Sequence, residues 1–99
     1  MQRMVFPPRI SRSVLENRPS AYIHDGHHVH AYYTNSDELN YVILTRMKEP
    51  NHKTQWNVYN GFMEDNGQVV RVTDGLEFRS NESAAFREYY RRVRESIHE

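Results

Sequence analysis

Four histidines lie close together in the first third of the chain, at His24, His27, His28 and His30. Imidazoles are ligands for zinc, copper and nickel, and they also titrate near neutral pH. The turn signal Asp25-Gly26 predicts a hairpin that places His24 opposite His27 on one face and His28 with His30 on the other. The histidines are then divided between two faces, and no spacing fixes a third ligand. We therefore expect no bound metal or cofactor, and a hairpin that is sensitive to pH; a metal site built from these four residues is the alternative.

Basic residues near the C-terminus are the second group with possible chemistry. Arg87, Arg91 and Arg94 could contact phosphate, while tyrosine and tryptophan side chains could stack on bases, as in proteins that bind single strands. However, the 13 basic and 13 acidic residues of the chain cancel, and glutamates are interleaved with these arginines. A field that attracts nucleic acid is therefore not expected, and nucleic-acid binding is an alternative function only.

Catalysis has no recognisable motif in this chain. The sequence contains no cysteine, and we find no nucleophile elbow, phosphate-binding loop or paired-carboxylate motif. Histidine, arginine, tyrosine and carboxylates could still form a general acid–base site. A small histidine-dependent enzyme is therefore a further alternative, and a non-enzymatic protein is preferred.

The region that must position these residues is a predicted β-meander. It consists of three apolar runs rich in β-forming residues, Leu39–Glu49, Thr54–Glu64 and Gln68–Arg79. Asn66-Gly67 between the last two predicts a two-residue hairpin loop, which sets Met63 opposite Val70, Gly61 opposite Val72 and Phe62 opposite Arg71. Gly61 is expected at a bulge, and Gly75 at either a bulge or a further hairpin.

The flanking segments complete the predicted domain. Residues 1–20 are expected to form an extended arm with at most a short helix, because Pro7-Pro8 and Pro19 interrupt regular structure. Ala21–Tyr33 reads as the histidine hairpin. Ser80 or Asn81 can cap a C-terminal helix of about 17 residues. One predicted apolar stripe follows this helix, formed by Phe86, Tyr89, Tyr90, Val93 and Ile97.

These elements predict an α+β fold, with a five- or six-stranded antiparallel sheet and one C-terminal helix packed on one face, in a single domain at 21–99. The central strands carry apolar residues on both faces, and one helix covers only one of them. We therefore predict a homodimer that covers the second face, with Tyr41, Trp56 and Tyr59 as anchors. The main alternative is that the arm folds back over this face as a lid.

The expected function is that of a small soluble binding module that acts through protein contacts. No apolar run approaches the roughly 20 residues that a membrane span needs, and the N-terminus lacks the apolar core of a signal peptide. We therefore expect a cytoplasmic protein without a membrane contact, and a protein partner that the sequence does not identify.

Overall fold

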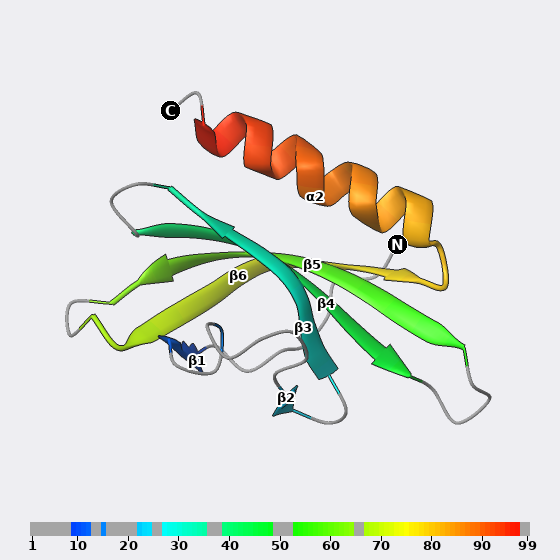
Figure 1. Cartoon of the computed structure of the whole chain (residues 1–99), viewed down its shortest axis with the longest axis horizontal. Coiled ribbons are helices and arrows are strands. Elements are labelled where there is room, and N and C mark those ends of the chain that lie inside the picture. The colour runs from blue at the N-terminus through cyan, green and yellow to red at the C-terminus, as the bar shows by residue number, and fades with distance from the viewer. Residues whose placement is uncertain are drawn as a thin grey trace.

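The computed structural model describes residues 9–12, 15, 22–24, 27–35, 39–48, 53–64 and 67–97. Six strands form one antiparallel sheet, and a single long helix lies across it (Figure 1). The elements are β1 (Arg9–Ser11), β2 (Tyr22–His24), β3 (His27–Thr34), β4 (Asn40–Lys48), β5 (Thr54–Met63), β6 (Val69–Arg79) and α2 (Glu82–Ile97). The predicted α+β class is confirmed.

Strands β2 to β6 follow one another as a meander, and β1 pairs with the outer edge of β6, which gives the order β1-β6-β5-β4-β3-β2. The predicted register of the β5–β6 hairpin is confirmed, because Met63 pairs with Val70 and Phe62 with Arg71. Its connection differs in detail. The Gly67 amide donates to the Glu64 carbonyl, so the hydrogen-bonded turn spans residues 64–67, one residue earlier than a two-residue loop at Asn66-Gly67 would place it.

A bulge in β6 lies opposite Tyr59. Val58 pairs with Leu76 and Asn60 with Thr73, so Asp74 and Gly75 together oppose one residue of β5. Asp74 has a φ of 54°, in the left-handed region that few non-glycine residues adopt. A Cβ on Gly75 would lie 2.6 Å from the ring of Tyr59. Gly75 thus marks a bulge, one of the two predicted outcomes, and its lack of a side chain leaves room for the tyrosine ring.

Gly61 does not form the bulge that we predicted. It pairs regularly with Tyr41 on one side and Val72 on the other. A Cβ at this position would lie 2.7 Å from Cγ1 of Val70. Close packing within the sheet, and not an irregular backbone, therefore explains the glycine.

In the histidine hairpin, His24 pairs with His27 as predicted, but Tyr22 pairs with His28, so the register shifts beyond the first pair. The turn residues Asp25 and Gly26 lie outside the described residues, as do the side chains of His24 and His27. A second shift occurs in β3, where Val29 pairs with Thr45 and Ala31 with Leu44. His30 is therefore the extra residue of a bulge.

The sheet is covered on both faces by the chain itself. On the helix side, Val42, Leu44 and Val58 pack with Ala85 and Tyr89 of α2. On the opposite side, Ile10 and Leu15 from the predicted arm pack against Ile43 and other buried residues. Ile10 is 3% exposed and Leu15 is fully buried, so the predicted arm contributes to this core, with Ile10 in the edge strand β1. The homodimer stays a prediction.

Helix α2 is rotated relative to the prediction. Asn81 is its N-cap, because its side-chain oxygen accepts a hydrogen bond from the Ala84 amide. The buried residues are Ala85, Tyr89 and Arg92, whereas Tyr90 and Ile97 are 54% and 57% exposed. The predicted stripe is therefore wrong for these two residues. A buried arginine occupies the helix–sheet contact, and Tyr90 and Ile97 lie on the outside.

Enlarging Gly75 should destabilise the fold. The ring of Tyr59 is buried on all sides, so it has no free space into which a new Cβ at 2.6 Å can displace it. We expect Gly75→Ala to lower the free energy of unfolding by about 1–3 kcal/mol, measured by urea denaturation. Thr73→Ala, at an exposed position of the same strand, is the control and should stay within about 0.5 kcal/mol. Equal midpoints for the two variants would contradict the close contact.

Candidate functional site

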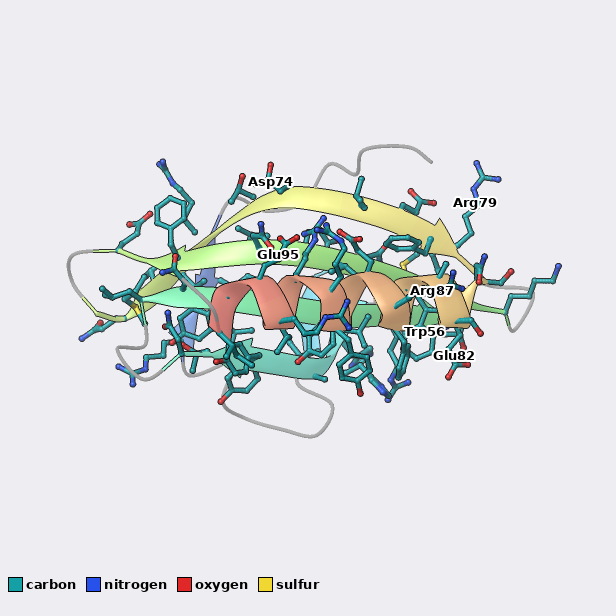
Figure 2. All side chains as sticks on the ribbon, turned by 90° about the horizontal axis from the view of Figure 1, so that it is seen from above. Trp56, Asp74, Arg79, Glu82, Arg87 and Glu95 are labelled. Atoms are coloured by element: carbon teal, nitrogen blue, oxygen red, sulfur yellow. The ribbon has the colours of Figure 1, made fainter. Side chains whose placement is uncertain are left out.

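The two long sides of α2 differ in chemistry. The helix contacts β4, β5 and β6, and seen from above it has β6 along one side and β3 along the other (Figure 2). The side toward β6 carries charged side chains, with Glu95 and Asp74 at its margin. On the side toward β3, the ring of Phe86 lies 5.5 Å from that of His30. Each side is a candidate surface.

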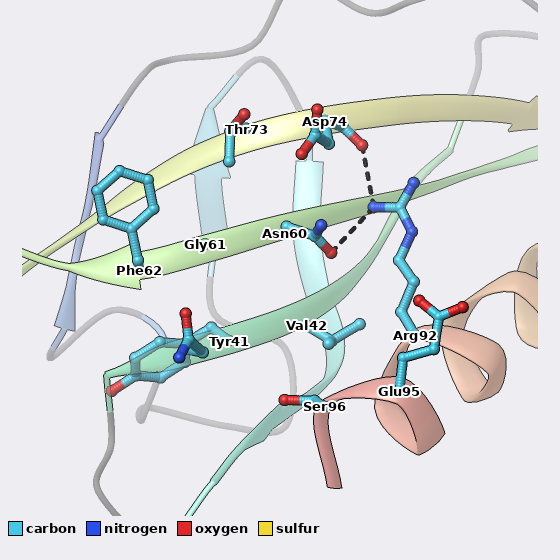
Figure 3. Close-up of a pocket in the computed structure, with 11 residues that line it drawn as sticks. Tyr41, Val42, Asn60, Gly61, Phe62, Thr73, Asp74, Arg92, Glu95 and Ser96 are labelled. Carbon is cyan, nitrogen blue, oxygen red and sulfur yellow. Dashed lines mark hydrogen bonds between the residues drawn. The ribbon is translucent and has the colours of Figure 1, made fainter. Parts of the chain in front are cut away.

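Arg92 is the buried charge of the first side. The residue is 8% exposed, and three acceptors from three elements surround its guanidinium, two of which, on Asn60 and Asp74, are drawn in Figure 3. Nε donates to Glu88 at 2.7 Å, and Nη1 donates to the Asn60 side chain at 3.2 Å and to the Asp74 carbonyl at 2.9 Å. The planar fork of arginine suits several fixed acceptors. Arg92 therefore connects α2 to β5 and to the bulge of β6.

A cleft of about 220 Å³ opens beside this guanidinium. Its lining combines side-chain amides, hydroxyls and carboxylates with two aromatic residues, Tyr41 and Phe62 (Figure 3). The principal side chains are Asn40, Asn60, Phe62, Thr73, Asp74, Arg92, Glu95 and Ser96. Because Glu88 already neutralises Arg92, a free anion would gain little charge attraction here. The amides, hydroxyls and carboxylates of the lining suit hydrogen bonding to a small polar group.

A ladder of ion pairs runs along the same side of the helix. Arg91 contacts Glu88 at 2.6 Å and Glu95 at 2.5 Å. The hydrogen bond from Arg91 is the main reason that the pKa of Glu88 lies below its usual value; burial opposes this shift, and Arg92 adds to it. Arg91, predicted as a phosphate contact, is thus already engaged by two carboxylates.

Arg87 and Arg94 are in a different situation. Both are exposed, and neither forms an ion pair or hydrogen bond with the part of the chain that the structure describes. Spacings of three and four residues place them beside Tyr90 and Ile97 on the outward side of α2. We call these four residues, Arg87, Tyr90, Arg94 and Ile97, the outer strip.

Aromatic contacts connect the outer strip to the core. Tyr90 packs against Phe86 and Tyr89, with ring centroids 6.4 and 5.3 Å apart. Phe86 in turn meets Trp56 edge to face at 5.2 Å, and His30 meets Trp56 in the same manner at 5.0 Å. Such edge-to-face contacts are favourable ring geometries, so the exposed ring of Tyr90 packs on the half-buried Phe86 and the buried Tyr89.

The three aromatic residues that we predicted as interface anchors lie in the core. Tyr41, Trp56 and Tyr59 are 3%, 7% and 1% exposed. Tyr41 and Tyr59 pack in the cluster covered by Ile10 and Leu15, and Trp56 packs in the cluster beneath α2. These rings hold the two faces of the sheet and present little surface to a partner.

The histidines are only partly described. His28 is half-buried and His30 is exposed. Within the described residues, no three histidine, aspartate or glutamate side chains come together as a metal site would require. The same residues include no helix with the length and apolar character needed to cross a membrane.

The sequence analysis missed Arg92 as a site residue. A signal was present, because Ala85, Tyr89 and Arg92 are spaced four and three residues apart and so share one side of a helix. Ala85 and Tyr89 are the buried members of that side. A charged residue on the same side of the helix as Ala85 and Tyr89 is nevertheless expected to face the solvent, since arginine is almost never fully buried unless it is paired.

Comparisons of this chain with protein-family models, with curated proteins and with solved structures find no match. The function is therefore inferred from the side chains of this protein alone.

Protonation of His30 should destabilise the protein. Although His30 is exposed overall, its ring packs against Trp56 and Phe86; this partial burial, with the nearby Arg46, lowers the pKa of His30 below 6.5, and Glu82 partly opposes both effects. Between the folded pKa and 6.5, the unfolded chain then binds more protons than the folded chain, so stability falls as the pH drops through 6.5 and levels off below the folded pKa. We expect His30→Phe, which keeps a ring against Trp56, to reduce the loss of stability between pH 7 and about 5 in urea denaturation. Identical pH profiles for the variant and the parent chain would show that His30 does not contribute.

Proposed function

We propose that this chain is a non-enzymatic binding module that acts through protein contacts, with the outer strip of α2 as its contact surface. The observation that carries this proposal is the exposure of Tyr90 and Ile97, each of which is more than half accessible to solvent. They share one side of the helix with Arg87 and Arg94, which form no ion pair with the described carboxylates. Aromatic residues and arginine are the types most enriched at the energetic centres of protein interfaces.

The rigidity of the surface supports the same function. Tyr90 stands on Phe86 and Tyr89, and Arg92 fixes the helix to two strands. Because the ring of Tyr90 is supported in this way, binding it costs less conformational entropy than ordering an unsupported side chain would. The proposal takes the module to act in the cytoplasm, as the sequence predicts.

A second copy of the chain is a less favoured partner. The predicted homodimer was meant to cover a free sheet face, but Tyr41, Ile43 and Tyr59 are already buried within the chain, in a cluster that includes Ile10 and Leu15. Self-association through the outer strip would bring positive charges together, because each copy presents Arg87 and Arg94. We therefore propose a different protein as the partner and treat self-association as an outcome of the test.

Photo-crosslinking tests the proposal in cells that make the protein. A benzophenone amino acid replaces Tyr90 in one variant and Gln68, exposed at the β5–β6 connection, in the control. We expect a discrete adduct from position 90 that protease removes and nuclease does not, and none from position 68.

Two results would contradict the proposal: an adduct that nuclease destroys, which indicates nucleic acid, or equal labelling from both positions. An adduct of twice the mass of the chain would keep protein contacts as the function and identify a second copy as the partner.

A further inference from the structure

We infer that the outer strip binds an acidic amphipathic helix of a partner protein. This inference rests on the proposed function and names the chemistry of its partner. It follows from the charge balance, the apolar content and the spacing of the strip.

The charge balance of α2 is uneven around its circumference. On the side toward β6, Arg91 and Arg92 are matched by Glu88 and Glu95, at distances between 2.5 and 2.7 Å. Arg87 and Arg94 have no such match among the described residues, although the whole chain has no net charge. The outer strip is therefore locally positive, and carboxylates on a partner would complete ion pairs that the chain itself leaves open.

The apolar content excludes a purely electrostatic contact. Tyr90 and Ile97 are 54% and 57% exposed, and the half-buried Phe86 and Val93 lie next to them at the margin of the core. On β3, Ala31 and Tyr33 are likewise half-buried at that margin. A partner that covers these residues removes apolar area from water, so it must carry large apolar side chains as well as acids.

The spacing of the strip matches a helix. Arg87 and Arg94 are seven residues apart, and so are Tyr90 and Ile97; seven residues correspond to two turns, or roughly 10 Å, along a helix axis. A partner helix that packs nearly parallel to α2 repeats its contacts at the same interval. A partner helix with acidic residues seven apart, each followed by an apolar residue, would contact both the arginines and the apolar side chains of the strip.

Two other occupants fit less well. A second copy in antiparallel helix packing would place Arg87 near Arg94 of the partner subunit, and like charges in contact cost free energy. Nucleic acid would gain little from the apolar part of the strip, because Ile97 offers neither a charge for phosphate nor a ring for stacking.

A display selection with the full chain as bait tests the inference directly. The library presents helical peptides with randomised outward positions. We expect enriched peptides to be acidic, with glutamate or aspartate seven residues apart beside leucine, isoleucine or phenylalanine. Affinities of the enriched peptides are then measured by fluorescence anisotropy with the parent chain and its variants.

The variants separate charge from apolar contact. Exposed ion pairs are individually weak, so Arg87→Gln with Arg94→Gln should weaken binding about three- to tenfold, and more at low salt than at high salt. Tyr90→Ala should weaken it tenfold or more. Arg71→Gln, which removes one exposed charge from β6, is the matched control and should leave the affinity unchanged.

The outcomes distinguish the inference from the proposed function. Enriched peptides that are neutral or basic, or that bind the Arg87/Arg94 variant as tightly as the parent chain, would overturn the acidic partner and leave a protein-binding module. Failure to enrich any peptide would also overturn the inference. If, in addition, a single-stranded oligonucleotide bound and lost affinity in the Arg87/Arg94 variant, the proposed function would fall as well.

Discussion

The guanidinium of Arg92 sets how the helix sits on the sheet. A charge that is 8% exposed is costly unless acceptors surround it, and here the acceptors come from α2, β5 and β6. Satisfying all three requires that the Arg92 side of the helix faces the sheet. Tyr90 and Ile97, on another side of the helix, are then turned to the solvent. The exposed strip that we propose as the binding surface is thus a consequence of a buried polar contact.

Irregularities of β6 help the sheet to accommodate the buried Arg92. The Asp74–Gly75 bulge presents the Asp74 carbonyl to Arg92, and the absence of a side chain at Gly75 lets the ring of Tyr59 lie beneath it. Further along β6, Trp56 pairs with Arg79 and Asn57 with Glu77, so Phe78 is an extra residue that packs under the helix. Bulges bend a strand and redirect its side chains. In this protein one bulge supplies an acceptor for the buried arginine, and the other adds an apolar residue to the core beneath the helix.

The sequence allowed the fold to be predicted where the signals were local. The meander, the pairing of Met63 with Val70, the cap at Asn81 and the helix all follow from turn chemistry and periodicity. The rotation of the helix could not be predicted, because the stripe of Phe86, Tyr90, Val93 and Ile97 is more apolar than that of Ala85, Tyr89 and Arg92. Only the two acceptors outside the helix, Asn60 and the Asp74 carbonyl, which are distant from Arg92 in sequence, decide between the two. Contacts between residues distant in sequence also explain the misplacement of Tyr41 and Tyr59. We predicted them as interface anchors because no sequence pattern indicates that Ile10 and Leu15 join them in one buried cluster. Arg87 and Arg94 were identified from sequence as exposed basic residues, but the neutralisation of Arg91 depends on side-chain geometry.

The exchange rates of the arginine side-chain Nε–H protons, measured by NMR on the intact protein, test this account most directly. Buried and hydrogen-bonded to Glu88, the Nε–H of Arg92 should exchange with water much more slowly than those of Arg87 and Arg94, which are exposed in the same helix. The three arginines serve as controls for one another in one sample, without any substitution that risks unfolding. A slow Arg92 signal beside fast Arg87 and Arg94 signals is the predicted result. Equally fast exchange for all three would contradict a helix that is held on the sheet by a buried guanidinium.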